Sequence, residues 1–317
     1  MKKTLVAMAV LAASGASFAQ ATLTGSYAFG YATTSSAAGA KSSGLGTDTA
    51  AMQLSASEDL GGGLKASARV SLGGMQRDGA GTGEDAYIQL DGSFGTIKMG
   101  TVEAGNGILG NGGAGAPGWM LDNGSVLTGG ANIDTIGWTS ADMGGLKLKA
   151  SYSDKGTGAT TGLGQGTNGA AVSQPSMNVG VTYAAGALSA AADYTSWTRQ
   201  GDAAVTSNTN DHRVRISGSY NLGVAKIGAG YSNRKNTAGA TDRETVMGVS
   251  APMGAATVGA TYDTRQTFAG VKTKGFTLGA QYDLSKRTNI GAGYYSWSTN
   301  GVAGDNTGFR VLVGHSF

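Results

Sequence analysis

The chain has 317 residues, of which 56 are Gly, 3 are Pro and none is Cys; 40% are hydrophobic and only 14% are charged. This composition excludes a disulfide scaffold, thiol catalysis and collagen, and the repeated apolar stretches of about 18 to 25 residues that a helical membrane protein needs are missing. A soluble globular domain typically has about 25% charged residues. A single large all-β domain rich in Gly, Ser and Thr fits these numbers best.

The first nineteen residues have the pattern of an export signal. Lys2 and Lys3 precede an apolar stretch at residues 4–13, and residues 17–19 (Ser-Phe-Ala) have the small-x-small form that signal peptidase cleaves. Ten apolar residues are too few to span a hydrocarbon core about 30 Å thick. We therefore expect a cleaved signal peptide at residues 1–19 and a single domain at residues 20–317. Cleavage removes two of 23 basic residues and none of the 20 acidic ones, so no net basicity remains to favour nucleic acid as a partner.

Beyond the signal, apolar residues recur at every second position. In one segment Leu146, Leu148 and Tyr152 alternate with Lys147 and Lys149. This period is typical of a strand with one apolar and one polar face. Similar series follow one another along the mature chain, and most of them end in an aromatic residue. We count about sixteen such strands.

The aromatic ends of the strands distinguish two β architectures. A soluble sandwich gives no reason for Tyr to gather at strand ends, whereas in a transmembrane barrel Tyr and Trp collect where hydrocarbon meets the lipid headgroups. The alternate positions hold Ser, Thr, Gly, Asn and charged residues, which are costly in a dry core and favourable beside water. The sequence therefore predicts an all-β fold, a transmembrane antiparallel β-barrel of about 16 strands.

The connections alternate between short and long, as in outer-membrane barrels with tight periplasmic turns and extended outer loops. Short turns rich in Asp and Gly are predicted at residues 58–63, 91–95, 142–145, 184–187, 221–223, 252–255 and 284–287. Long loops are predicted between them, notably at residues 34–49, 103–131 and 154–175.

Several segments, in this order, carry a likeness to a known family. They are residues 21–25 (ATLTG), 58–64 (EDLGGGL), 94–100 (FGTIKMG) and 311–317 (VLVGHSF), which end on Phe317. The mature chain resembles the Gram-negative general diffusion porins, above all those of the beta-proteobacterial and neisserial type. The resemblance implies a sixteen-stranded outer-membrane barrel that assembles as a homotrimer in lipid and forms a passive water-filled channel for small hydrophilic solutes and inorganic ions. It also implies recognition of Phe317 by the barrel-assembly machinery, and a long third outer loop folded into the lumen.

Residues 103–131 match that third loop by position. They include Ile108, Leu109, Trp119 and Met120, whose side chains are of the kind usually buried, so we expect this segment to narrow the lumen. A floppy external loop is the alternative. Family members commonly carry Arg where this chain has Thr101, so we expect the constriction to lack one positive charge.

Strand alternation also predicts which charges face the lumen. On the predicted inner face, ten basic residues oppose four acidic ones, namely Lys65, Arg69, Lys98, Lys147, Lys149, Arg213, Arg215, Lys226, Arg265 and Arg310 against Asp85, Asp193, Asp263 and Asp283. Basic walls concentrate anions and repel cations, so we expect mild anion preference. The alternative is that several of these residues lie near strand ends and face bulk water. The predicted pore-lining residues are Arg69, Lys98, Lys147, Lys149, Arg213, Arg215 and Arg310, with Asp122 opposing them from the loop.

Catalytic, cofactor and metal motifs are scarce. His212 follows Asp211, and His315, the other histidine, has lipid-facing parity, so no Ser-His-Asp arrangement can be proposed and we expect no enzyme activity and no cofactor. Acidic residues in the predicted outer loops, which usually stay solvated, could hold a divalent cation; these are Asp154, Asp202, Asp242 and Asp305.

Two further functions stay open. A solute-selective porin would need a track of aromatic residues along the lumen, for which the inner face offers Tyr87, Tyr295 and Trp297. A non-conducting structural or adhesin barrel is the other, although a secreted β-helix predicts short solenoid repeats that the sequence lacks.

Overall fold

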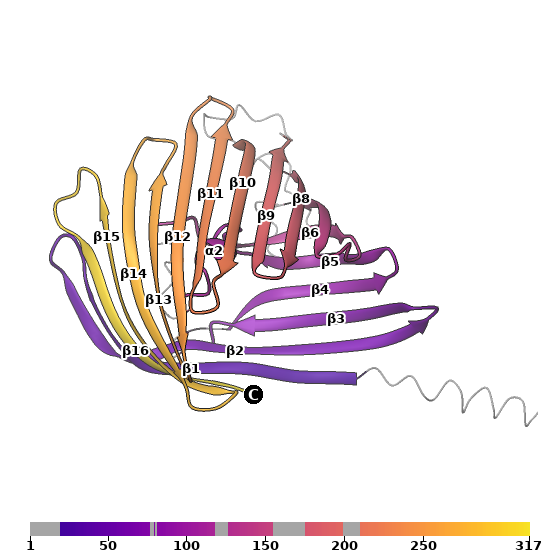
Figure 1. Cartoon of the computed structure of the whole chain (residues 1–317), viewed down its shortest axis with the longest axis horizontal. Helices are drawn as coiled ribbons and strands as arrows, with labels where there is room; N and C mark the ends of the chain where they lie inside the picture. The colour runs from indigo at the N-terminus through magenta and orange to yellow at the C-terminus, as the bar shows by residue number, and fades with distance from the viewer. Residues whose placement is uncertain (1–19, 77–78, 80, 118–125, 155–174, 199–209) are drawn as a thin grey trace, which may run out of the picture.

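The computed structural model describes residues 20–76, 79, 81–117, 126–154, 175–198 and 210–317. Over these residues sixteen antiparallel strands follow one another in chain order and close into one barrel, with β1 beside β16 (Figure 1). The predicted architecture and strand number are confirmed. The strands are β1 (Gln20–Ser35), β2 (Lys41–Gly61), β3 (Leu64–Gly73), β4 (Thr82–Gly92), β5 (Gly95–Ala104), β6 (Ala131–Thr139), β7 (Leu146–Asp154), β8 (Ser176–Ala185), β9 (Leu188–Trp197), β10 (Asn210–Asn221), β11 (Lys226–Asn236), β12 (Thr241–Met253), β13 (Ala256–Gln266), β14 (Lys272–Asp283), β15 (Thr288–Thr299) and β16 (Asn306–Ser316).

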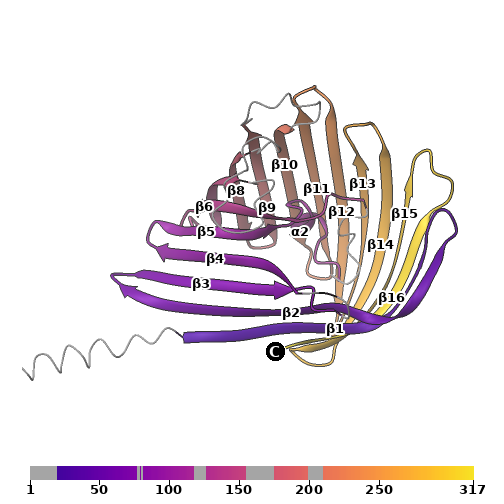
Figure 2. The same cartoon turned by 180° about the vertical axis from the view of Figure 1, so that it is seen from behind.

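One short helix, α2 (Leu109–Gly112), lies in the segment between β5 and β6. Both views of the barrel show it among the upright strands β10 to β12, and it contacts β9 to β12 (Figures 1 and 2). No described helix has the length and apolar character needed to cross a membrane.

The barrel has its apolar side chains outside. On β10, Ile216 is 59% exposed, whereas Ser217 and Ser219, on the opposite face of the same strand, are 5% and 4% exposed. The described residues form only one small cluster of buried apolar side chains, and this cluster joins the segment after β5 to the barrel wall. A wall of this kind needs an apolar medium around it, since apolar surface is driven out of water.

Aromatic residues ring the outer wall at two levels, as predicted. Tyr183, Tyr220 and Tyr282 are exposed near the strand ends that lead into short turns. At the opposite strand ends, exposed tyrosines lie on five strands, namely Tyr152, Tyr194, Tyr231, Tyr262 and Tyr294. Two such girdles mark the two edges of a hydrocarbon layer.

The short turns lie where the sequence predicts them. The turn between β2 and β3 contains Gly61, Gly62 and Gly63 with φ of 80°, 62° and 79°, a left-handed run that residues with a Cβ rarely adopt. The long loop expected at residues 34–49 was wrong, because β1 runs to Ser35 and β2 begins at Lys41. The Ser and Thr residues that suggested a loop there pair across the two strands.

Candidate functional site

The segment between β5 and β6 packs against the inner barrel wall. Val246 belongs to β12 and faces inward, since its neighbour Met247 is exposed on the outer wall. Val246, Ile108 and Leu127 are at most 1% exposed and form the buried cluster, with Leu109 packed against it. Valine facing a water-filled lumen would be unfavourable unless it were covered, and the segment supplies that cover.

Glycines on the inner wall make room for this segment. A Cβ at Gly230 of β11 would lie 2.8 Å from Cβ of Ile108, and one at Gly248 of β12 would lie 2.5 Å from the carbonyl carbon of Gly113. At Gly259 of β13 the corresponding distance is 2.7 Å, to Cβ of Ala116. Three neighbouring strands therefore have no side chain at the positions where the segment between β5 and β6 crosses them.

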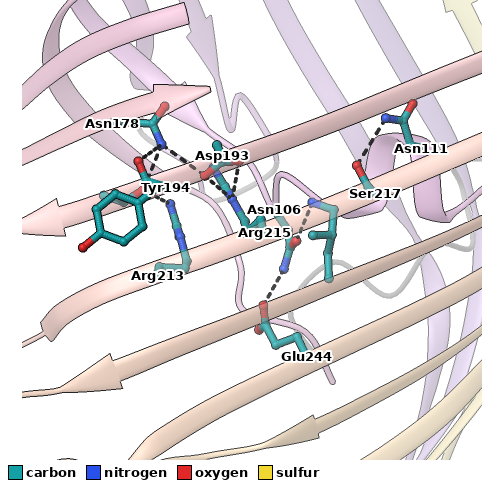
Figure 3. Close-up of polar contacts among 11 residues, drawn as sticks. Asn106, Asn111, Asn178, Asp193, Tyr194, Arg213, Arg215, Ser217 and Glu244 are labelled. Carbon is teal, nitrogen blue, oxygen red and sulfur yellow. Dashed lines mark hydrogen bonds and ion pairs between the residues drawn. The ribbon is translucent and has the colours of Figure 1, made fainter. Parts of the chain in front are cut away.

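Polar contacts fix both ends of the segment to β12. Asn106 Nδ2 donates to Glu244 Oε2 at 3.2 Å (Figure 3). The same nitrogen donates to the carbonyl oxygen of Thr128, also at 3.2 Å. The backbone N–H of Thr128 donates to the other carboxylate oxygen of Glu244. Further along, Ser250 Oγ donates to the carbonyl oxygen of Ala114 at 2.6 Å. We call the contacts among Asn106, Thr128 and Glu244 the clasp.

Most arginines on the inner face are neutralised by a carboxylate. Arg215 Nε lies 2.9 Å from Asp193 Oδ2 (Figure 3), and Arg310 Nη1 lies 2.9 Å from Asp48 Oδ1. A third pair joins Arg69 Nη2 to Asp85 Oδ2 at 3.3 Å. Asp242 of β12, 3% exposed, accepts from two arginines at 2.8 Å each, which are Arg234 and Arg265.

Arg213 on β10 differs from these arginines. Among the described residues it has no carboxylate partner, and its Nε is enclosed without a hydrogen bond. The guanidinium lies 5.5 Å from the centre of the Trp197 ring, and Nη2 contacts Thr195 Oγ1 at 3.4 Å. It lines a cavity of about 550 Å³ between the segment and strands β6 to β12, together with Arg215 and other polar residues.

Lysines on the inner face have weaker partners. Lys98 Nζ lies 4.2 Å from the centre of the Tyr87 ring, and Arg69 lies 5.9 Å from the same ring. Lys149 is in no ion pair within the described part of the chain and lies opposite a Thr and a Gly on its neighbouring strands. Lys147 Nζ is 3.6 Å from Asp142 Oδ2 in the short turn before β7, so it lies at the mouth of the barrel that faces away from the long loops.

Comparison with known proteins identifies the family. The sequence model described as Gram-negative porin matches residues 4–301. The chain belongs to the Gram-negative porin family. Among curated proteins, Outer membrane porin protein 32 of Delftia acidovorans is 40% identical to this porin over 113 residues, which are 32% of this chain. The match spans 31% of that relative's own length.

Solved structures agree on the fold of this porin. The anion-selective porin from Comamonas acidovorans superimposes with a TM-score of 0.72 at 22% identity, covering 95% of this chain and 100% of that one. A loop-deletion variant of OmpT, an outer membrane protein of Vibrio cholerae, has a TM-score of 0.68 at 14% identity and covers 94% and 99% of the two chains. A variant of Rh. blastica porin has a TM-score of 0.67 at 17% identity, and the match covers 94% of this chain and 100% of that one.

The inner face of this porin carries more carboxylates than alternation predicts. Asp48 lies at a bulge of β2, which shifts the register and turns its side chain inward to Arg310. Asp242 and Glu244 have inward parity on β12 but no apolar series precedes them to reveal it. The expected ratio of ten basic to four acidic residues was therefore wrong. Asp242 is also no loop residue, because it lies on β12, and its carboxylate is buried between two arginines.

Other predicted residues are placed as follows. Arg234 was missed, although its inward parity follows from Lys226 on the same strand. Thr101 shares the outward parity of Met99, and its hydroxyl donates to Asp134 at 2.6 Å. Tyr295 packs on Trp297, with ring centres 5.1 Å apart. Asp122, Trp119, Met120 and Asp202 lie outside the described residues.

The two histidines lie on the outer wall. His212 Nδ1 is 2.9 Å from Asp211 Oδ2, and its ring stacks on the exposed Tyr194 with centres 6.0 Å apart. His315 Nδ1 is 2.9 Å from the Thr288 hydroxyl at the end of β16. No group of three or more potential metal-ligating side chains occurs within the described ranges.

Proposed function

We propose that this porin is a passive, water-filled channel of the Gram-negative outer membrane for small hydrophilic solutes and inorganic ions, with a mild preference for anions. The polar inner face of the closed barrel supports the channel. The packing of Ile108 and Leu127 on Val246 supports a lumen narrowed by the third outer loop. No conductance from folded protein would instead favour the structural or adhesin barrel.

The observation that carries the anion preference is the contrast between paired and unpaired charges beside this segment. Asp193, Asp242 and Glu244 each face an arginine within 4 Å, which cancels most of their attraction for cations. Arg213 has no such partner among the described residues, so its positive charge is not neutralised and can attract an anion that passes through the lumen. One similar solved structure is described as an anion-selective porin.

The proposal extends to assembly. We infer a homotrimer in outer-membrane lipid, export through cleavage after residue 19, and recognition of Phe317 by the barrel-assembly machinery. Support for the trimer comes from a similar OmpT structure described as a trimer, with a TM-score of 0.65. Support for a C-terminal role comes from Phe317 itself, which closes the seam between β16 and β1.

The zero-current potential of the protein in a planar bilayer under a KCl gradient tests the anion preference. We expect the wild type to reverse toward the chloride potential, and Arg213→Gln to move the reversal toward the potassium potential. Arg243→Gln removes the same charge from the outer wall of β12 and should leave the reversal unchanged. A wild type that prefers potassium, or equal shifts for the two variants, would refute the assignment.

A further inference from the structure

The inner face of the barrel has a region with very small side chains where β15, β16, β1 and β2 are neighbours. These are not the strands that α2 contacts, which are β9 to β12. The inward-facing positions that register brings together here include Gly30, Ala32, Gly44, Gly46 and Gly308. Four of them line a hollow of about 370 Å³ together with Tyr295 and Arg310. We call this hollow the shelf.

The fold itself does not require glycine at two positions of the shelf. Nothing lies within 4 Å of a Cβ built at Gly44 or at Gly46, and neither residue has a positive φ. Glycine inside a strand weakens the strand and often marks a place where a ligand or another backbone approaches closely. At Gly230 and Gly248 the segment after β5 is that neighbour. Over Gly44 and Gly46 the space is open to a molecule that enters the lumen.

Tyr295 forms the aromatic side of the shelf. A Cβ at Gly308 would collide with Cζ and Oη of Tyr295, so the phenol ring lies across the backbone of β16. Trp297, two residues nearer the outer end of β15, packs beside this ring with the ring centres 5.1 Å apart. Tyr295 is half-buried and keeps part of its surface exposed. The shelf therefore presents an aromatic ring that its neighbours hold in place.

Arg310 and Asp48 form the polar side of the shelf. The Arg310 side chain reaches from β16 across β1 to Asp48 on β2, where Nη1 lies 2.9 Å from Oδ1, and each side chain is 29% exposed. Within the described part of the chain, Nε and Nη2 of Arg310 have no hydrogen-bond partner, and Asp48 Oδ2 accepts only from the Thr49 hydroxyl at 3.2 Å. The pair is neutral as a whole and offers free donors and acceptors next to each other.

We propose that the shelf binds a neutral pyranose sugar. The face of an aromatic ring is negative, so the C–H groups on one face of the sugar ring stack on Tyr295. Sugar hydroxyl groups both donate and accept hydrogen bonds, which matches the adjacent guanidinium of Arg310 and carboxylate of Asp48. An anion is disfavoured, because Asp48 already cancels the charge of Arg310. The hollow has the size of a small-molecule site, for which about 300–1,000 Å³ is usual.

This inference rests on the proposed water-filled channel, through which the sugar reaches the shelf. Two measurements on the purified, folded protein test it. In a planar bilayer, the KCl current is recorded while glucose is added, or sorbitol, which has the same number of carbons but no ring. In detergent solution, saturation-transfer NMR measures the contact of glucose, sorbitol and gluconate with the protein whether or not it conducts.

The test variants remove either the ring or the space. Tyr295→Leu removes the aromatic face, and Gly44→Val fills the open hollow at a position where a Cβ meets no other atom. Tyr294→Leu is the matched control, because it makes the same substitution on the outer wall of the same strand. Tyr295→Phe keeps the ring and guards against a folding defect.

We expect glucose to reduce the wild-type current saturably, and sorbitol to have a much smaller effect. In Tyr295→Leu and Gly44→Val the affinity for glucose should fall about tenfold, the equivalent of about 1.4 kcal/mol, whereas Tyr294→Leu and Tyr295→Phe should bind as the wild type does. In the NMR measurement, saturation should be strongest on the C–H groups of one face of the glucose ring.

Equal responses to glucose and sorbitol, stronger binding of gluconate than of glucose, or equal binding by Tyr295→Leu and Tyr294→Leu would overturn the proposal. A wild type that conducts but shows no saturable response to glucose in either measurement would refute the shelf and leave the channel intact. A protein that binds glucose in the NMR measurement but does not conduct would refute the channel and leave the shelf.

Discussion

Gly25 and Phe317 exchange two backbone hydrogen bonds, each 3.0 Å between nitrogen and oxygen, at the seam where the last residue of the chain meets β1. A Cβ at Gly25 would lie 2.4 Å from Cζ of Phe317. The aromatic ring therefore occupies the space that any side chain at residue 25 would need. Gly25 and Phe317 thus extend the ladder of β1 and β16 by one more pair, and the ring of Phe317 fits there because residue 25 has no side chain.

Replacing Gly25 by Val should weaken the closed barrel. The new side chain displaces the Phe317 ring and strains both hydrogen bonds, and overpacking of this kind costs about 1–3 kcal/mol. The measurement is gel electrophoresis of samples heated beforehand to a series of temperatures. We expect the fast-migrating band of the folded barrel to disappear at a lower temperature than in the wild type. Gly46→Val on β2 is the matched control, because nothing lies within 4 Å of a Cβ there. If both variants lost the folded barrel at the same temperature, the space that the Phe317 ring occupies beside Gly25 would have no special role in stability.

Gly248→Val should change the pore without removing any charge. Its Cβ would lie within 2.6 Å of both the carbonyl carbon and oxygen of Gly113, so the segment after β5 must move off the wall into the lumen. We expect a lower single-channel conductance at constant ion preference. A conductance equal to that of the wild type would mean that this segment does not limit the current.

Ile108→Ala should loosen the same segment. Ile108 is fully buried against Val246, and deletion of such a side chain costs about 2–5 kcal/mol. We expect faster limited proteolysis between β5 and β6 while the barrel itself keeps its thermal stability. Ile136→Ala removes an isoleucine that is exposed on the outer wall and serves as control. A proteolysis rate unchanged from the wild type would argue against the packing described.

Asp242→Asn should raise anion preference. The substitution leaves Arg234 and Arg265 without the carboxylate that each contacts at 2.8 Å. Hydrogen bonds to charged groups contribute about 1.5–3 kcal/mol, so we also expect a small loss of thermal stability. The measurement is the zero-current potential, which should move further toward the chloride potential than in the wild type. For Asp305→Asn, in an exposed outer turn, we expect no change, and an equal shift there would contradict a local effect.

Much of the fold could be predicted because alternation is a local property. In β7, Leu148 and Tyr152 face outward and Lys149 faces inward whatever strand lies beside them, since successive side chains point to opposite faces. The turns and the strand number follow from the same reasoning. The prediction of a loop at residues 34–49 failed because Ser and Thr suit a water-facing strand as well as a loop.

The charge balance of the lumen could not be predicted in this way. The bulge at Asp48 turns a carboxylate inward, and no apolar series in the sequence indicates this bulge. The groups that contact Arg213 or Asp242 depend on which strands are neighbours, which alternation within one strand does not specify.

The sequence by itself therefore determined a two-faced barrel wall with aromatic edges, because each strand carries its own alternating pattern. Only the tertiary structure decided which charges of the lumen are cancelled and where the segment after β5 lies. Ion pairing and the fit of Ile108 against Gly230 depend on distances of a few ångström between residues far apart in the chain, and closure of the barrel sets those distances.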